Sequence, residues 1–409
     1  MISSGRMAPL GTGRTWFGLL QRPAFWLFLI VLGIASWIAV GEETAFQRIS
    51  PAGFALSWAL LALYALPVLL LVYHLDLHRT HPAVLLIGSF LWGAVIATGL
   101  AGYANHGWIL VVSRLGTPAF AARWTPALTA PVVEETMKVA GVLVLYLIGR
   151  DALRDPMDGF VYGATIGLGF MIVEDVFYFM AVFGGTPRDV LFGFATRALM
   201  SGLYGHALWT GLAGMGVAYL LSRRAASGAA RRELLAAGMY LAALGGHFLW
   251  DSPLLALYPA SPHGLGWLMF ALAGAVKGLP FIGLAAGSIV LARRRERRGL
   301  EAALASRGAD FGISAEEASL LLDRKRWRRA RRDVRATNGR RVARSVRRLR
   351  REELRLASLL DVATSESDGT VARIGARCRA LRSSIDAAEG QDEPRRKSHQ
   401  DRASRGRAG

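Results

Sequence analysis

Three ionisable side chains interrupt a stretch that is otherwise apolar enough to cross a lipid bilayer. Glu134, Glu135 and Lys138 lie between Pro126 and Ile148, where most other side chains are apolar. A charged side chain at the centre of a membrane costs about 3 kcal/mol on insertion scales, so two carboxylates and an ammonium group in one span require a compensating environment. We therefore interpret this segment as part of a functional site.

Three later apolar segments contribute further side chains that can carry protons or bind metal ions. The first contains Glu174 and the second contains His206. His247 and Asp251 lie four residues apart at the end of the third, so they share one helix face. Helical backbone is disfavoured immediately before Pro253, which places Asp251 in the final turn of that helix. Carboxylates and imidazoles are the groups used by metal sites and by proton relays in membranes.

The depth of each side chain along its helix indicates whether all of them can share one site. At 1.5 Å per residue, Glu134, Glu174 and His247 lie about 7–13 Å below the outer ends of their spans. His206 lies about 24 Å along its span. It reaches the same level only if the residues before Thr196 lie in the interface or if the helix is strongly tilted. We predict that the glutamates and both histidines converge in the outer half of the bilayer.

Hydrolysis of an amide bond is one reaction that such residues can carry out inside a membrane. The reaction needs an activated water, a group that stabilises the developing oxyanion, and a proton donor for the leaving amine. A catalytic zinc ion takes three protein ligands and leaves its fourth position to water. We assign His206, His247 and Glu174 as the zinc ligands. Asp251 is then either a fourth ligand or the acceptor that orients His247.

The carboxylates of the first segment supply the general base in this scheme. Either Glu134 or Glu135 activates the water, while Lys138 keeps the other carboxylate ionised. Lys138 follows Glu134 by four residues, so an ion pair that braces the helix is compatible with this role. A mechanism that uses glutamate and histidine without a bound metal stays open.

A different class of protein would use the same residues as a proton relay. A proton-coupled transporter or channel places carboxylates and histidines along its pathway. Such proteins usually contain an internal repeat of broken helices, and the sequence shows none between its first and second halves. We keep the transporter or channel as the alternative interpretation.

The apolar segments predict an all-α, polytopic membrane protein. Hydrophobic residues make up 53% of the chain, in runs long enough to cross a hydrocarbon core of about 30 Å. We predict about eight transmembrane helices, at residues 24–41, 54–74, 82–104, 126–148, 158–183, 190–221, 233–252 and 265–292. The predicted organisation is a leader (1–23), a transmembrane protease domain (24–292), a basic amphipathic helical tail (293–387) and a disordered C-terminus (388–409).

Positive charge predicts the orientation and the partners of the tail. Arginines are more frequent in the loops after the second, fourth and sixth spans, so we expect both termini on the cytoplasmic side of the cell membrane. About 15 of the 19 net positive charges follow Ala292, which favours contact with anionic lipid over nucleic acid. An apolar stripe within the tail predicts amphipathic helices; it consists of Val342, Val346, Leu349, Leu356 and Leu360.

The spacing of these motifs resembles that of a known family. Glu-Glu-x-x-Lys at 134–138, Phe-x-x-x-Glu-x-x-x-Tyr at 170–178, His206 in the next span, and His-x-x-Trp-Asp at 247–251 follow in order, each in its own span. This pattern resembles the PrsW family of intramembrane metalloproteases, which is related to the CAAX-prenyl endopeptidase and bacteriocin-immunity proteins. The resemblance covers roughly residues 20–292. It implies cleavage of a membrane-anchored protein, typified by an anti-sigma factor, on its extracytoplasmic side.

Overall fold

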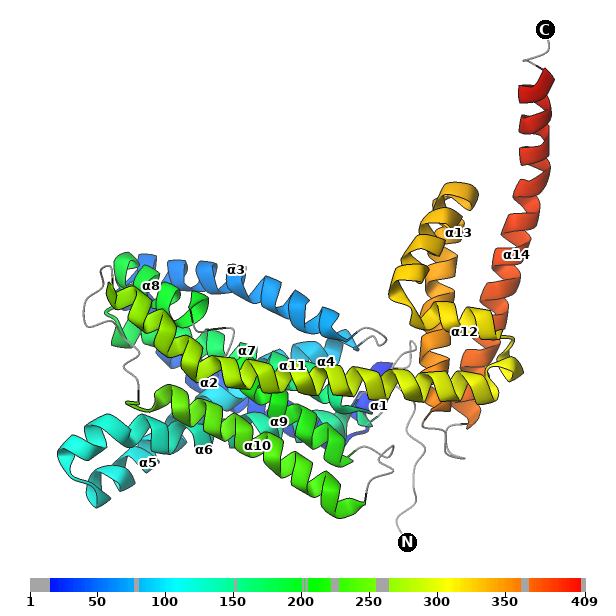
Figure 1. The fold of residues 1–409 in the computed structure, drawn as a ribbon. Helices are drawn as coiled ribbons and strands as arrows, with labels where there is room; N and C mark the ends of the chain where they lie inside the picture. Colours follow the sequence, from blue (N-terminus) through cyan, green and yellow to red (C-terminus); the bar gives the residue numbers. More distant parts are fainter. Residues whose placement is uncertain are drawn as a thin grey trace. The chain divides into compact units, whose positions relative to one another are not determined.

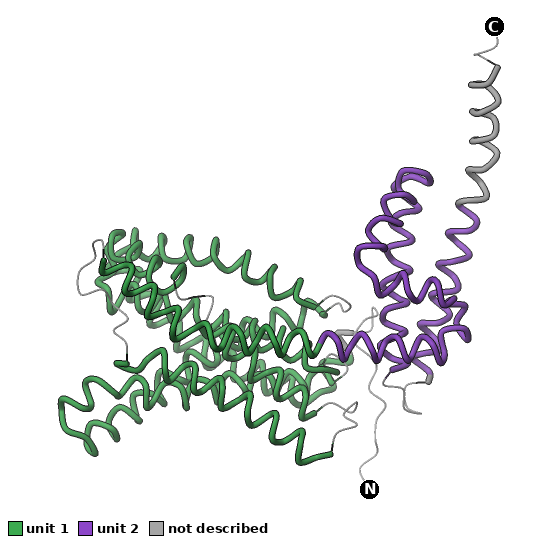
Figure 2. Tube along the Cα trace, in the orientation of Figure 1, with its two compact units in different colours: residues 1–76, 81–292 green, residues 77–80, 293–409 purple. Residues whose placement is uncertain are grey.

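The chain folds into helices throughout the part that the structure describes. The computed structural model describes residues 15–76, 81–150, 153–200, 202, 205–221, 228–254, 265–361 and 368–405. Every regular element in these ranges is a helix, which confirms the all-α prediction. Two compact units are present (Figure 2): residues 1–76 with 81–292, and residues 77–80 with 293–409. Most of the leader predicted at 1–23 lies outside the described residues.

The first unit contains a bundle of long helices (Figure 1). Its elements in chain order are α1 (Thr15–Leu20), α2 (Pro23–Ile49), α3 (Pro51–Leu75), α4 (Ala83–Leu91), the π-helix η1 (Trp92–Ala97), α5 (Thr98–Leu115), α6 (Pro118–Ile148), α7 (Pro156–Phe177), the π-helix η3 (Tyr178–Val182), α8 (Pro187–Gly193), the π-helix η4 (Phe194–Leu199), α9 (His206–Leu221) and α10 (Ala229–Asp251). The next helix, α11 (Leu265–Arg307), begins in this unit and ends in the second.

Several of these helices can cross a membrane. Among the described residues, 5 helical segments are long and apolar enough by length and composition: Pro23–Ile49, Pro51–Leu75, Ala83–Leu115, Pro156–Val182 and Leu265–Arg307. The protein is therefore a multi-pass membrane protein. Helices α6 and α10 occupy two further predicted spans but carry charged residues, and α9 is a shorter apolar helix. The count of eight spans stays a prediction.

The prediction of one continuous sixth span at 190–221 is wrong. The described residues of this segment form α8, η4 and then a separate helix, α9, which begins at His206. Gly202, between η4 and α9, lies against Tyr64, and a Cβ atom at residue 202 would come within 2.3 Å of the tyrosine hydroxyl. Glycine is a poor helix former and is tolerated where another chain segment approaches closely. The break removes the depth conflict, because His206 starts a helix instead of lying 24 Å along one.

Helices α7 and α9 pack in direct backbone contact. Gly159, Gly163 and Gly167 are spaced by four residues and therefore lie on one face of α7. A Cβ atom on Gly163 would lie 2.3 Å from the carbonyl oxygen of Thr210, and one on Gly167 would lie 2.2 Å from that of His206. Small residues at such spacing let membrane helices approach closely. This contact fixes the first turn of α9, and thus His206, against α7.

Local sequence signals explain where the helices that carry the site begin. Helix α6 starts at Pro118, and the side chain of Thr117 accepts a hydrogen bond from a backbone amide in its first turn. Helix α7 starts at Pro156, with Asp155 and Asp158 forming a reciprocal capping box. Proline in the first turn and an oxygen-bearing cap before it are favourable because the first amides lack helical partners. These helix starts set the register of the motifs that follow.

The second unit has its own hydrophobic core. It contains the end of α11, the 3₁₀ helix η6 (Ala309–Phe311), α12 (Ala315–Leu322), α13 (Arg324–Leu360) and α14 (Asp368–Arg405). Gly339, with φ of 80°, kinks α13. Helix α14 continues past Ala388, into the segment for which composition favours disorder.

The predicted apolar stripe of the tail is confirmed as one helix face. Val342, Leu349, Leu356 and Leu360 are buried, and Val346 packs against the same core. These side chains pack with residues of α12 and α14, so the stripe lies inside the second unit. Many arginines of α13 remain exposed. Any lipid contact of this helix therefore uses its basic face.

Candidate active site

The ammonium group of Lys138 lies among the acidic side chains of α6. Glu134, Glu135 and Lys138 are all buried, with 4%, 0% and 0% of their surface exposed. Nζ of Lys138 donates to Glu135 Oε1 at 2.9 Å and to Glu134 Oε2 at 3.3 Å. It also lies 2.8 Å from Nδ1 of His206 and 3.7 Å from the ring centroid of Phe170. The predicted Lys138–Glu134 pair is confirmed and extends to a second carboxylate.

Glu135 is held by contacts with three neighbouring side chains. Its Oε2 accepts a hydrogen bond from Thr210 at 3.0 Å, and its Oε1 accepts from Lys138. Oε1 also lies 3.1 Å from Nδ1 of His247. Because Glu135 is enclosed and bonded at both oxygens, it is suited to orienting His247 and not to meeting a substrate.

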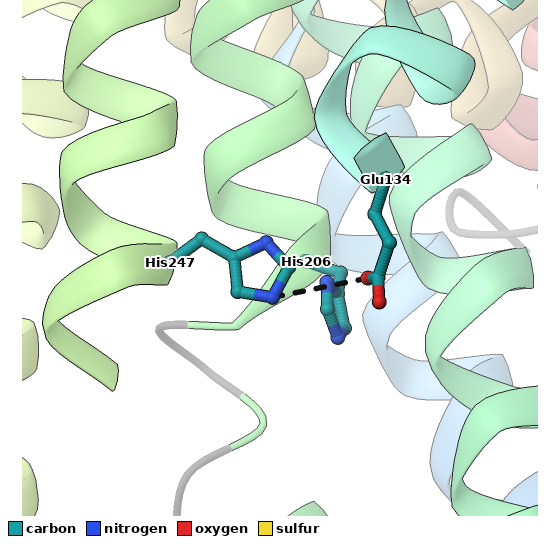
Figure 3. A group of neighbouring side chains, drawn as sticks. All are labelled: Glu134, His206 and His247. Atoms are coloured by element: carbon teal, nitrogen blue, oxygen red, sulfur yellow. Dashed lines mark ion pairs between the residues drawn. The ribbon is translucent and has the colours of Figure 1, made fainter. Parts of the chain in front are cut away.

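Glu134 faces the opposite edge of His247. Its Oε2 lies 3.8 Å from Nε2 of His247, and its Oε1 accepts a hydrogen bond from Asn105 at 3.1 Å. Figure 3 shows Glu134, His206 and His247 pointing toward one another from separate helices. One possible ligand atom from each of these three residues lies within 4.8 Å of the other two.

Aromatic packing holds the two histidine rings close together. The ring centroids of His206 and His247 are 4.9 Å apart. Trp209 stacks on His247 with centroids 4.7 Å apart and 17° between the planes, and it meets His206 edge-on at 5.2 Å. Both histidines are buried. The two rings are thus fixed in orientation as well as position.

Glu174 lies at Nε2 of His206, the ring nitrogen that does not face Lys138. Its Oε2 is 2.8 Å from Nε2 of His206 and accepts a hydrogen bond from Arg197 Nη2 at 2.8 Å. Nε of Arg197 also donates to Asp175 at 2.5 Å. Arg197 therefore bridges two adjacent carboxylates of α7.

The end of α10 brings Asp251 into the group. Oδ2 of Asp251 lies 3.2 Å from Nε2 of His247, one turn earlier, as the spacing predicts. Nζ of Lys277 from α11 donates to the carbonyl oxygens of Trp250 at 3.2 Å and Ser252 at 3.0 Å. Lys277 is buried, and it caps the C-terminal end of α10.

The structure brings together all the side chains that the sequence singled out for chemistry. The contacts above join Glu134, Glu135, Lys138, Glu174, His206, His247 and Asp251 in one cluster. Sequence reasoning missed Lys277, although a lone lysine in an apolar span was a usable signal. It also missed Thr210 and Asn105, for which the sequence offers no comparable signal.

The donor atoms of this cluster fit a divalent metal ion. Ligands about 2.0–2.2 Å from one zinc ion lie about 3–4 Å from each other, so small side-chain rotations would close Glu134, His206 and His247 around an ion. An ion bound through Nδ1 of His206 would replace Lys138 at that nitrogen. An ion bound through Nε2 would replace Glu174. In either case a carboxylate stays on the second nitrogen of His247.

Buried histidines and carboxylates within a bundle of membrane-spanning helices are groups that can hold a catalytic metal ion or carry protons. Residues 81–276 match the family described as PrsW family intramembrane metalloprotease. The match to this family of intramembrane metalloproteases identifies the protein as a peptide hydrolase, and the family implies a metal. No match was found among curated proteins or among solved structures. The matched residues include every member of the cluster, whereas Lys277 lies just beyond them.

Proposed function

We propose that this protein cleaves a membrane-anchored protein substrate in the outer half of the bilayer, using a zinc ion held by Glu134, His206 and His247. The observation that carries this proposal is the grouping of their donor atoms within 4.8 Å. The family match identifies a hydrolase, so the transporter or channel alternative is not carried further. An anti-sigma-factor-like protein is the substrate class that we infer.

The roles proposed here differ from those assigned from the sequence. Glu174 meets Nε2 of His206, and Glu135 meets Nδ1 of His247, so each carboxylate can fix the orientation of one histidine. Glu174 is then an orienting residue instead of a zinc ligand. Glu134 is then a zinc ligand instead of the general base. Glu135 is not the general base either, because both of its oxygens are already bonded.

The remaining polar groups supply the proton transfers. Bound zinc would lower the pKa of a water and polarise the scissile carbonyl. Asp251, beside Nε2 of His247, accepts the proton of the attacking water and passes it to the leaving amine. Lys138 adds a positive charge next to Glu134, where it stabilises the developing oxyanion. Buried walls of aromatic and aliphatic side chains strengthen these charge interactions.

Paired measurements of metal and cleavage test this proposal. We expect purified protein in detergent to contain zinc and to cleave a membrane-anchored reporter, and we expect Glu134→Gln to lose both. Val132→Ala is the matched control, because Val132 is an exposed apolar residue of the same helix. Cleavage by metal-free protein in the presence of chelator would favour the glutamate mechanism without metal. Undiminished cleavage by Glu134→Gln would exclude this site.

The tail has a separate proposed role. Both termini are proposed to be cytoplasmic, with the exposed arginines of α13 against anionic lipid. Since the apolar stripe is enclosed in the second unit, this binding would be electrostatic and sensitive to salt. Nucleic acid is the less favoured partner. Binding to vesicles with and without anionic lipid tests this role. The wild type should bind the anionic vesicles more tightly than a variant with glutamines at the exposed arginines of α13.

A further inference from the structure

A second buried cluster of possible metal ligands lies in the first unit. Asp76, His81 and Asp158 are 7%, 8% and 2% exposed. Nε2 of His81 lies 3.1 Å from Oδ2 of Asp76, and Nδ1 of His81 lies 3.8 Å from Oδ1 of Asp158. One possible ligand atom from each residue lies within 4.8 Å of the other two. None of these residues belongs to the protease cluster.

The helix ends orient the two carboxylates of this cluster. Oδ2 of Asp158 accepts hydrogen bonds from the backbone amides of Arg154 at 2.8 Å and Asp155 at 3.1 Å. These bonds leave Oδ1 on the side of His81. Asp76 is the C-terminal cap of α3, where the helix dipole is negative. A buried carboxylate in this position is stabilised by a nearby cation.

The histidine of the cluster is also fixed in place. The ring of Tyr162 meets His81 edge-on, with centroids 5.2 Å apart and 84° between the planes. Mixed carboxylate and imidazole donors suit zinc and related transition metals.

We propose that Asp76, His81 and Asp158 form a structural metal site that binds a zinc-like divalent ion. The ion would join the end of α3, the segment before α4 and the first turn of α7. Asp158 and Glu174 both lie in α7, sixteen residues apart. At 1.5 Å per residue, the two sites are therefore about 24 Å apart along this helix. The second site therefore stabilises one end of the bundle and takes no part in the cleavage chemistry.

Metal content measured on the full-length protein in detergent tests this inference. We expect two zinc equivalents per wild-type chain, one in His81→Gln, one in His247→Ala, and none in the double variant. Asp76→Asn provides a second variant if His81→Gln does not fold. Both Asp76→Asn and His81→Gln should keep cleavage activity and show a lower thermal midpoint than wild type. The same midpoint should fall when chelator is added to His247→Ala.

The two metal assignments can fail separately in this experiment. One equivalent that is lost in His81→Gln but kept in His247→Ala would support the structural site and contradict zinc at the protease cluster. Equal metal content in wild type, His81→Gln and Asp76→Asn would overturn the structural site. A wild-type chain without any bound metal after purification and zinc addition would overturn it as well.

Discussion

Nδ1 of His247 lies 3.1 Å from Oε1 of Glu135, and this contact turns the other nitrogen of the histidine toward Glu134. Two adjacent glutamates of one helix thus meet opposite edges of one imidazole ring. Their chemical environments differ accordingly, since Glu135 is enclosed by Thr210 and Lys138 while Glu134 belongs to the group of possible metal ligands.

The two glutamates should therefore respond differently to the same substitution. We expect Glu135→Gln to lower cleavage by about 10- to 100-fold, the usual cost of losing a carboxylate that orients a ligand histidine. Glu134→Gln should abolish cleavage and bound metal together. Rates of reporter cleavage, divided by the amount of folded protein, give the comparison. Equal residual activity and equal metal content in the two variants would contradict the assigned roles.

Lys277 should act on cleavage through the last turn of α10. Its ammonium group bonds the carbonyls of Trp250 and Ser252, on either side of Asp251. Losing these charged hydrogen bonds in Lys277→Met should cost about 1.5–3 kcal/mol and lower the rate of cleavage about tenfold or more. Lys277→Arg should restore part of the rate. A Lys277→Met protein that is less stable but cleaves normally per folded molecule would limit Lys277 to a structural role.

The backbone contact between α7 and α9 should not tolerate a larger residue. A Cβ atom on Gly163 would lie 2.3 Å from the carbonyl oxygen of Thr210, whereas one on Gly238 would meet nothing within 4 Å. We expect Gly163→Ala to destabilise the protein by about 1–3 kcal/mol, as overpacking does, and to reduce cleavage by moving His206. Gly238→Ala, in α10, is the matched control. Thermal unfolding in detergent measures the stability of both variants. Similar midpoints for Gly163→Ala and Gly238→Ala would refute the close packing of α7 and α9.

Burial of Glu353 in the second unit should make this unit sensitive to pH. Desolvation, with the nearby Glu317 carboxylate, raises the pKa of Glu353 to about 7 despite its pairing with Arg382. Because the folded-state pKa lies above the unfolded value, the stabilisation is fully present below about pH 4.3 and is lost as the pH rises through about 7. Hydrogen exchange in α13, corrected for intrinsic rates, should show less protection at pH 8 than at pH 5.5. Glu353→Gln should remove this difference.

The arginine distribution predicts the topology of the chain. Reporter fusions after Arg224 and after Arg298 should report a cytoplasmic location, and a fusion within Pro259–Gly264 should report an external one. Residues 259–264 lie outside the described residues. An external location for the fusion after Arg298 would reverse the side of the membrane proposed for the tail.

The sequence was sufficient to predict which residues meet, but it was not sufficient to predict their contacts. Intramembrane charges are costly, so their presence in separate spans already indicates a shared site. Glu134 and Glu135 lie about 100° apart on their helix, and only the packing of α9 and α10 decides which one faces a metal position. The planar guanidinium group of Arg197 bonds both Asp175 and Glu174, and the sequence does not show that one cation bridges these two carboxylates.

Local backbone breaks were the main source of error in the fold. Mean apolarity continues from Val190 to Leu221, so the segment resembles one span. Gly202 lies between η4 and α9, and a side chain there would meet Tyr64, a residue far away in the chain. The glycines of α7 at spacing four were a readable signal for close helix contact, although the partner helix could not be identified from them.

The bonds of Lys138 have a consequence for how the enzyme is made. The ammonium group already contacts Glu134, Glu135 and His206, so the cluster contains its own compensating cation. The helices could therefore insert and assemble before any metal arrives. If the proposed zinc ion binds Nδ1 of His206, its loading would be a later exchange of one cation for another, and the protease would stay latent until an ion is delivered.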